Sequence, residues 1–421
     1  MTYIVPPRSA ADHYFRYTAN QMGAGTADRF RAHLQQFGVN MDGLAQQHRT
    51  WISSGQTEAK PSLDIYNQAP QPAPTTPQDP AEVAGNVNAA MARLSDIAYG
   101  VQRMLHAQVD WLEGQPDPAA VSGAPVDGTD GDDEQHVYHN QTSSSGAGND
   151  TIYNYRHGTV DAGAGNDKAV LYMGGGEVNL GEGDDLALIY NGTARGGDGK
   201  DQFTLLNGGR AYGGTGDDRF LVMDRGHVYG EDGDDHIEIV AGGLGASGFA
   251  DGGDGNDTII AHGRAQLFGG AGDDVLTVSG GFRSKFNGGT GNDTINLLPE
   301  ADYGYRIEYN KGDGDDIIAG DLSGVKVTSF KPLIEDGKFI KFVQDGPSRM
   351  MHKGQVVLGE GIARDEVTAV RDGNDVRVSF GSAGGSITFR DFQDTAPRLA
   401  FADGSWLDVA KLLEAAPGNP A

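Results

Sequence analysis

Just past its middle, the chain contains the stretch Gly252-Gly253-Asp254-Gly255-Asn256-Asp257-Thr258-Ile259. The same phrase recurs as Gly269-Gly270-Ala271-Gly272-Asp273-Asp274-Val275-Leu276. The general form is G-G-x-G-x-D-x-U, in which U is a large apolar residue. Eleven copies occur between about residues 128 and 318. The last Asp of each copy is taken as its anchor, and the anchors are Asp133, Asp150, Asp167, Asp185, Asp201, Asp218, Asp235, Asp257, Asp274, Asp293 and Asp316.

The glycines of the phrase suit a loop that turns backbone carbonyl groups inward. A Gly stands two residues before every anchor, and nine of the eleven copies have another Gly four residues before it. Glycine adopts positive φ angles readily, so the backbone can bend at both positions. Calcium takes roughly six to eight oxygen ligands, which carbonyl and carboxylate groups supply together. The phrase therefore predicts calcium loops, each followed by a strand that buries the residue U.

The spacing of the anchors predicts a solenoid with one calcium loop in each coil. Successive anchors are 17, 17, 18, 16, 17, 17, 22, 17, 19 and 23 residues apart. This is about two nonapeptides, so each period holds a glycine loop, a strand, a second turn and a second strand. Calcium clamped between neighbouring loops would form a ladder along one edge. Eleven loops leave ten gaps, and at about 4.8 Å for each gap the ladder would be roughly 50 Å long.

The charge of the chain supports bound cations. It has 32 basic and 59 acidic residues and a formal net charge of −27. Residues 127–320 hold 34 acids and 12 bases, which gives −22 for this region. Stacked anchors would lie roughly 5 Å apart, which is unfavourable without a counter-ion. We therefore expect a region that folds with calcium and is largely unfolded without it. The acidic balance argues against nucleic acid as a partner.

The alternatives to a calcium solenoid are a disordered Gly/Asp-rich linker and a metal-free solenoid. A disordered linker has no reason to keep apolar residues two and four places after the anchor. Such pairs occur as Phe203 with Leu205 and as Ile237 with Ile239. The pattern favours the solenoid.

The repeats resemble the RTX, or haemolysin-type calcium-binding, proteins of Gram-negative bacteria. The resemblance covers residues 128–318, and residues 355–413 are more weakly similar to the haemolysin-type calcium-binding-related C-terminal domain. It implies a parallel β-roll that folds on meeting external calcium, and export by the type I secretion machinery. In the family, carbonyl groups of the glycine-rich positions and the carboxylate of the anchor are the metal ligands.

Carried to this chain, the resemblance implies about ten calcium ions. The implied metal ligands are Asp133, Gly146, Gly148, Asp150, Gly163, Gly165, Asp167, Gly181, Gly183, Asp185, Gly197, Gly199, Asp201, Gly214, Gly216, Asp218, Gly233, Asp235, Gly253, Gly255, Asp257, Gly270, Gly272, Asp274, Gly289, Gly291, Asp293, Gly312, Gly314 and Asp316. Gly is replaced at the first position of the phrase by Ser145, Ala162, Leu180 and Lys311, and at the second by Thr129 and Glu231.

The sequences before and after the repeats predict two further domains. The three expected domains are residues 1–126, 127–320 and 321–421. The first is helical, with proline-rich linkers at residues 53–80 and 113–126. Between these linkers, apolar residues recur at heptad spacing, which is typical of a coiled-coil seam. They are Val83, Val87, Ala90, Leu94, Ile97, Val101, Met104 and Trp111. We expect this segment to associate with copies of itself, and the alternative is an amphipathic helix packed within one subunit.

The last hundred residues predict a small β-rich cap that also contains the secretion region. The expected strands are residues 339–343, 355–358, 375–380 and 386–389, and a short amphipathic helix is expected over 406–413. The acidic turn Asp372-Gly373-Asn374-Asp375 predicts a hairpin turn rather than a metal site. An open end of a solenoid invites aggregation, so the structural task of this part is to cap the last coil.

The sequence offers no catalytic constellation. It contains neither the H-E-x-x-H of zinc proteases nor the G-x-S-x-G of lipases. It has no cysteine, no secretory signal peptide and no apolar run long enough to span a membrane. A regular Thr/Asn face like that of a calcium-bound bacterial antifreeze adhesin is also missing, which disfavours ice binding. Arginines on or near the second turns could form a basic edge that binds an anionic glycan, namely Arg156, Arg195, Arg210, Arg225, Arg264 and Arg283.

These observations predict a mainly β protein built on a parallel β-roll solenoid, with calcium on one edge. The expected function is structural: a secreted, non-enzymatic component of an extracellular matrix, surface layer, fibre or adhesion system. The alternative is a polysaccharide-active enzyme or an accessory carbohydrate-binding module, with a site near Tyr153, Tyr155 and His157.

Overall fold

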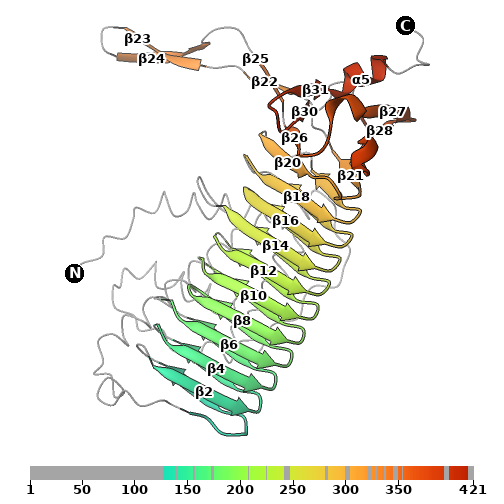
Figure 1. The fold of residues 1–421 in the computed structure, drawn as a ribbon. Helices are drawn as coiled ribbons and strands as arrows, with labels where there is room; N and C mark the ends of the chain where they lie inside the picture. The colour runs from blue at the N-terminus through green and yellow to red at the C-terminus, as the bar shows by residue number, and fades with distance from the viewer. Residues whose placement is uncertain are drawn as a thin grey trace, which may run out of the picture. The chain divides into compact units, whose positions relative to one another are not determined.

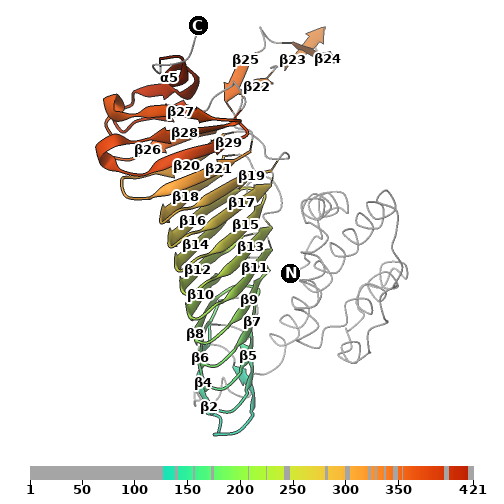
Figure 2. The same cartoon turned by 90° about the vertical axis from the view of Figure 1, so that its right-hand side faces the viewer.

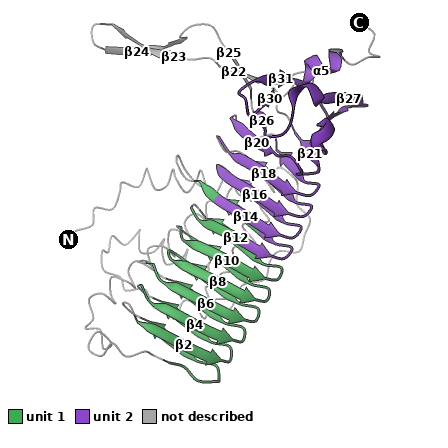
Figure 3. Cartoon of the chain, in the orientation of Figure 1, with its two compact units in different colours: residues 1–229, 237–248 green, residues 230–236, 249–421 purple. Residues whose placement is uncertain are grey.

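The computed structural model describes residues 127–137, 141–154, 157–171, 175–206, 208–223, 225–240, 247–279, 283–298, 304–320, 324–327, 330–335, 338–344, 349–352, 354–392 and 398–415. The expected N-terminal helices and the heptad segment lie outside these residues. The chain divides into two compact units, residues 1–229 with 237–248 and residues 230–236 with 249–421 (Figure 3).

Unit 1 is a parallel β-solenoid whose chain alternates between two sheets (Figures 1 and 2). The odd sheet has the order β1 (Glu134–Val137), β3 (Thr151–Asn154), β5 (Lys168–Leu171), β7 (Leu186–Ile189), β9 (Gln202–Leu205), β11 (Arg219–Met223) and β13 (His236–Val240). The even sheet has the order β2 (Thr142–Ala147), β4 (Thr159–Ala164), β6 (Glu177–Glu182), β8 (Thr193–Asp198), β10 (Arg210–Thr215) and β12 (His227–Asp232). Residues 230–232 of β12 and His236 of β13 are assigned to unit 2.

The core of unit 1 lies between the two sheets, where the apolar residues after each anchor meet. Parallel strands in register place identical repeat positions on top of one another, as with Phe203 and Phe220. Their rings stack with centroids 4.9 Å apart and an interplanar angle of 6°, and both are buried. The alternation expected from the sequence is therefore the one that fills the core.

One polar residue interrupts this core at the first coil. Gln135 replaces the expected apolar residue and is 3% exposed. Its Oε1 accepts hydrogen bonds from the hydroxyl groups of Ser143 at 2.5 Å and Ser145 at 3.1 Å. Gln135 and Ser145 both depart from the repeat. They compensate each other, because a buried side-chain amide requires hydrogen-bond partners.

Unit 2 has the same alternation of strands between two sheets, and its C-terminal strands depart from this alternation (Figures 1 and 2). Its odd strands are β15 (Thr258–His262), β17 (Val275–Ser279), β19 (Thr294–Leu297) and β21 (Asp315–Ala319), followed in the sheet by β29 (Ser386–Arg390), β28 (Asp375–Ser379) and β27 (Thr368–Asp372). Its even strands are β14 (Gly248–Asp254), β16 (Ala265–Ala271), β18 (Lys285–Thr290) and β20 (Tyr305–Tyr309), followed by β26 (Gly354–Leu358), β30 (Arg398–Ala400) and β31 (Trp406–Asp408).

The C-terminal strands extend both sheets and replace parallel pairing by antiparallel pairing. Strand β29 pairs parallel with β21, whereas β28 pairs antiparallel with β29. Strands β27 and β28 form the expected hairpin, in which Asp372 lies opposite Asp375 and Gly373 has a φ of +60°. The remaining elements are β22 (Gly324–Val327), β23 (Phe330–Glu335), β24 (Lys338–Gln344), β25 (Arg349–His352), the 3₁₀ turns η2 (Arg364–Glu366) and η3 (Gly381–Ala383), and the helix α5 (Val409–Ala415).

The four strands expected in this part are confirmed as β24, β26, β28 and β29. The helix expected over residues 406–413 is wrong at its start, because Trp406–Asp408 is strand β31, paired antiparallel with β30. The edge of β30 offers backbone hydrogen bonds, and the Arg398 guanidinium lies 4.3 Å from the Trp406 ring centroid. Cross-strand pairing therefore overrides the helical pattern for one turn. None of the helices that the structure describes is long and apolar enough to cross a membrane.

Candidate metal centre

Each glycine loop connects an even strand to the next odd strand, with the anchor at its end. In one coil, β16 ends at Ala271, Gly272 to Asp274 form the loop, and β17 begins at Val275. Every Gly named above as an implied ligand has a positive φ, from 96° at Gly312 to 144° at Gly255. Glu231, which replaces Gly at the second position, also has a positive φ of 76°. The loop shape is therefore kept even where the residue type is unfavourable.

The anchors form a hydrogen-bonded ladder within each unit. The backbone N–H of each anchor donates to Oδ1 of the anchor in the next loop. In unit 1 the donors are Asp133, Asp150, Asp167, Asp185 and Asp201, at 2.7–2.8 Å. In unit 2 they are Asp235, Asp257, Asp274 and Asp293, at 2.7–3.1 Å. One carboxylate oxygen of each acceptor is thus used to hold neighbouring loops together.

The other carboxylate oxygen, Oδ2, is buried and has no hydrogen-bond partner in seven anchors. These are Asp150, Asp167, Asp185, Asp201, Asp257, Asp274 and Asp293, each at most 2% exposed. A buried carboxylate oxygen without a partner is costly, so a row of them indicates places where a ligand would bind.

Backbone oxygen lies close to these orphaned atoms. A Cβ atom built on Gly252 would collide with Oδ2 of Asp257 and with the carbonyl oxygen of Gly269 in the next loop. The same holds for Gly269, which faces Oδ2 of Asp274 and the carbonyl oxygen of Gly288. The first Gly of the phrase therefore leaves the space in which a carboxylate oxygen and a carbonyl oxygen from adjacent loops approach each other.

Burial makes the charged form of these carboxylates unfavourable. It raises the pKa of Asp167 to about 6 and that of Asp185 to about 8, although a backbone N–H that donates to each acts in the opposite direction. Burial likewise raises the pKa of Asp274 and Asp316 to about 8. A carboxyl group whose pKa is higher in the fold than in the unfolded chain opposes folding once it is ionised. A bound cation would remove this penalty by compensating the charge.

The donor set fits a hard divalent cation such as Ca²⁺. It consists of carboxylate and carbonyl oxygens, contains no sulfur or imidazole, and leaves carboxylate oxygens that no protein donor satisfies. No cluster of three or more His, Cys, Asp or Glu that could hold a metal occurs in the described part of the chain. Anchors of adjacent loops and backbone carbonyl groups are the oxygen atoms that these loops offer to a cation.

A solved structure resembles this chain. It is the X-ray structure of a hyperactive, Ca²⁺-dependent, β-helical antifreeze protein from an Antarctic bacterium, with 28% sequence identity and a TM-score of 0.39. The match covers 46% of this chain and 65% of that chain. Comparisons with protein-family models and with curated proteins gave no match.

A second ladder, which the sequence analysis missed, runs through the residue before each anchor. In unit 1, Oδ1 of Asp132, Asn149, Asn166 and Asp184 accepts a hydrogen bond from the backbone N–H of the equivalent residue in the next loop. In unit 2, Asp234, Asn256, Asp273 and Asn292 do the same. This ladder is exposed. Its N–H donors lie in the loop after the acceptor, whereas those of the anchor ladder lie in the loop before the acceptor. Asp or Asn stands here in ten of eleven copies, a signal visible in the sequence.

The first loop differs from the others. Oδ2 of Asp133 accepts hydrogen bonds from the backbone N–H of Thr129 at 2.6 Å and from its hydroxyl group at 2.8 Å. Thr129 replaces the Gly of the second position. Protein donors thus satisfy the atom that is orphaned in the inner loops, so Asp133 has less need of a cation.

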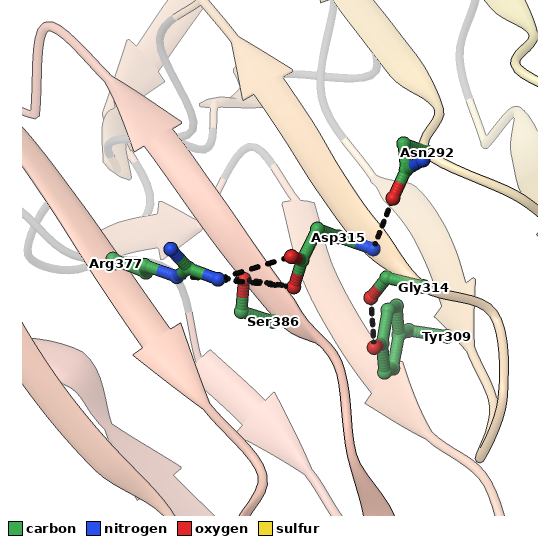
Figure 4. Close-up of polar contacts among 6 residues, drawn as sticks. All are labelled: Asn292, Tyr309, Gly314, Asp315, Arg377 and Ser386. Atoms are coloured by element: carbon green, nitrogen blue, oxygen red, sulfur yellow. Dashed lines mark hydrogen bonds and ion pairs between the residues drawn. The ribbon is translucent and has the colours of Figure 1, made fainter.

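The second ladder ends in the last loop at Asp315, which contacts residues of the C-terminal strands β28 and β29 (Figure 4). Ser386 lies in register with Asp315, and Ile387 lies in register with the anchor Asp316. An apolar residue therefore occupies the place of the next anchor. The Arg377 guanidinium contacts both carboxylate oxygens of Asp315 at 3.1 Å, and the Ser386 hydroxyl donates to the same carboxylate at 2.8 Å. The positive charge of Arg377 therefore compensates the negative charge of Asp315 in the last loop.

We expect Arg377→Met to destabilise the protein by only about 0.5–1 kcal/mol, because an exposed ion pair is screened by water. Both side chains are 55% exposed. Chemical unfolding in calcium should measure the loss, and the double variant Arg377→Met with Asp315→Asn should lose less than the sum of the single variants. Additive losses would show that the two side chains are not coupled.

Of the arginines expected on or near the second turns, two lie at or close to the beginning of even strands. Arg156 is outside the described residues. Arg195 lies on β8, with its guanidinium 4.2 Å from the Tyr212 ring centroid, and Arg210 begins β10. The Tyr212 ring stacks in turn on Tyr229 at 4.9 Å. These contacts give Arg195 a structural role on the outer face of the even sheet, and glycan binding stays a prediction.

Proposed function

We propose that this protein is a secreted, calcium-dependent structural protein of the RTX type. Its solenoid would fold on extracellular calcium after export by a type I secretion machinery. The folded protein would act as a component of an extracellular matrix, surface layer, fibre or adhesion system, without enzymatic activity. The C-terminal strands would cap the solenoid.

The observation that carries this proposal is the row of buried anchor carboxylates whose Oδ2 atoms have no protein partner. Their number and their repetition argue for a structural metal rather than a single regulatory site. A solenoid that requires millimolar-range external calcium would stay unfolded in the cytoplasm, where free calcium is low, and would fold only outside the cell. This coupling suits export of an unfolded chain.

The proposal is tested by the variant Asp274→Asn, which removes one buried charge and keeps an oxygen that can accept the hydrogen bond from Asp257. We expect equilibrium dialysis to show weaker calcium binding, by about tenfold at the affected sites, which corresponds to about 1.4 kcal/mol. The matched control is Asp273→Asn, which removes the same charge from the neighbouring exposed ladder. Equal effects of the two variants would reduce the role of the anchor to overall charge and contradict the site.

A further inference from the structure

The first loop of the solenoid contains the repeated phrase, but its backbone differs from that of the other loops. In the other loops, the second and fourth positions of the phrase both have a positive φ, and this holds even for Glu231. In the first loop these positions are Thr129 and Gly131, and neither of them has a positive φ. Positive φ at both positions is what turns the backbone carbonyl groups inward. The first loop therefore does not present its carbonyl oxygens as the other loops do.

The surroundings of the anchor carboxylate differ as well. At Gly252, the first position of an inner phrase, the polar atoms nearest to an added Cβ atom are a carboxylate oxygen and a carbonyl oxygen. At Gly128, the first position of the first phrase, they are the carbonyl oxygen of Ser145, Nε2 of Gln135 and Oδ2 of Asp133. An amide nitrogen thus lies where the inner loops have only oxygen atoms. Because an amide NH₂ group is a hydrogen-bond donor, it disfavours a cation at this place.

Hydrogen bonds within the protein use the oxygen atoms that a cation would bind. Oδ2 of Asp133 accepts from the backbone N–H of Thr129 at 2.6 Å and from its hydroxyl group at 2.8 Å. The carbonyl oxygen of Ser144 accepts from Nε2 of Gln135 at 3.3 Å and from the backbone N–H of Gly128 at 2.7 Å. Asp133 is also half-buried, whereas the inner anchors are at most 2% exposed. The first anchor therefore lacks the desolvated, unpartnered oxygen that characterises the inner loops.

The first two loops are nevertheless joined to each other. The backbone N–H of Asp133 donates to Oδ1 of Asp150 at 2.7 Å. The backbone N–H of Asn149 donates to Oδ1 of Asp132 at 2.8 Å. Both ladders thus continue through the first loop, and no cation is required to hold this loop to the second one.

We propose that the gap between the first and second loops of unit 1 binds no cation, and that Thr129 and Gln135 exclude the cation from it. The row of cation sites then begins at Asp150, and hydrogen bonds hold the first coil to the second at any calcium concentration. Asp133, which the family resemblance implies as a metal ligand, serves instead as a hydrogen-bond acceptor in its own loop. This inference rests on the proposed function, since it requires that the inner loops bind calcium.

Two matched anchor variants of the full-length chain test the proposal. Asp133→Asn and Asp150→Asn each remove one negative charge and keep an oxygen that accepts hydrogen bonds. Equilibrium dialysis counts bound calcium at a free concentration just sufficient to saturate the unmodified protein. Asp150→Asn should lose about one ion per molecule, because its Oδ2 has no protein partner in the structure. Asp133→Asn should bind as much calcium as the unmodified protein.

A second experiment restores the phrase in the first loop. Thr129→Gly supplies the glycine of the second position, and Gln135→Ile supplies the apolar residue, as at Ile152, with which Gln135 lies in register. The double variant should bind about one more calcium ion per molecule than the unmodified protein. The control Thr129→Ser keeps the hydroxyl donor and should leave the count unchanged. Circular dichroism in calcium checks that each variant is folded.

The outcomes separate this inference from the proposed function. A loss of calcium in Asp133→Asn equal to that in Asp150→Asn would place an ion in the first gap and overturn the inference, while the proposed function would stand. A folded double variant that gains no calcium would overturn the roles given to Thr129 and Gln135. A calcium count unchanged in both anchor variants would contradict the proposed function itself, and this inference with it.

Discussion

Removal of calcium with a chelator is expected to abolish the β-sheet circular dichroism of the solenoid, and returning calcium is expected to restore it. Without a cation, the anchors of each ladder must either ionise while buried or remain protonated near neutral pH. The raised pKa of Asp185 and Asp274, about 8 for each, shows that the fold disfavours the ionised form. The unfolded chain has no such penalty, so ionisation at neutral pH favours unfolding.

The size of the effect follows from the number of sites. At a free calcium concentration ten times the dissociation constant, each site contributes about 1.4 kcal/mol. Several sites in one unit then contribute as much as the entire stability of a typical domain, about 5–15 kcal/mol. The measurement is circular dichroism and thermal unfolding in chelator, calcium and magnesium. Magnesium should restore less structure, because it requires a tighter octahedral shell than loop oxygens provide.

An unchanged β signal in chelator, with an unchanged unfolding temperature, would contradict the calcium-dependent fold.

Gly270→Ala is expected to destabilise unit 2 by about 2–6 kcal/mol. Gly270 has a φ of +123°, and a non-glycine residue in such a conformation costs about 1–3 kcal/mol. A Cβ atom at this position would also collide with the carbonyl group of Gly253 in the preceding loop. Because stacked loops cannot separate without breaking the ladder, this overpacking adds about 1–3 kcal/mol.

The chain provides a matched control for this variant. Gly312 occupies the same position of the last phrase with a φ of +96°, and a Cβ atom there would meet nothing within 4 Å. Gly312→Ala should therefore show the conformational cost alone. Urea unfolding of both variants in calcium separates the two contributions. Equal losses for Gly270→Ala and Gly312→Ala would show that contact between stacked loops adds nothing.

The local pattern of the repeats determined much of the fold. Glycine at fixed positions before the anchor sets where the backbone takes positive φ, and every such glycine except Gly131 does so. The alternation after the anchor sets which side chains fill the core, as at Phe203 and Ile237. Both properties depend on a few neighbouring residues, so a sequence of such phrases specifies loop, strand and coil before any distant contact forms.

The tertiary structure alone decided what happens between coils and at their ends. Stacking directs one oxygen of each anchor to the next backbone N–H and leaves the other without a protein partner, as in Asp257. It brings Arg377 to Asp315 across 62 residues of sequence. These contacts join residues that are far apart in the sequence, so a pattern of neighbouring residues does not specify them.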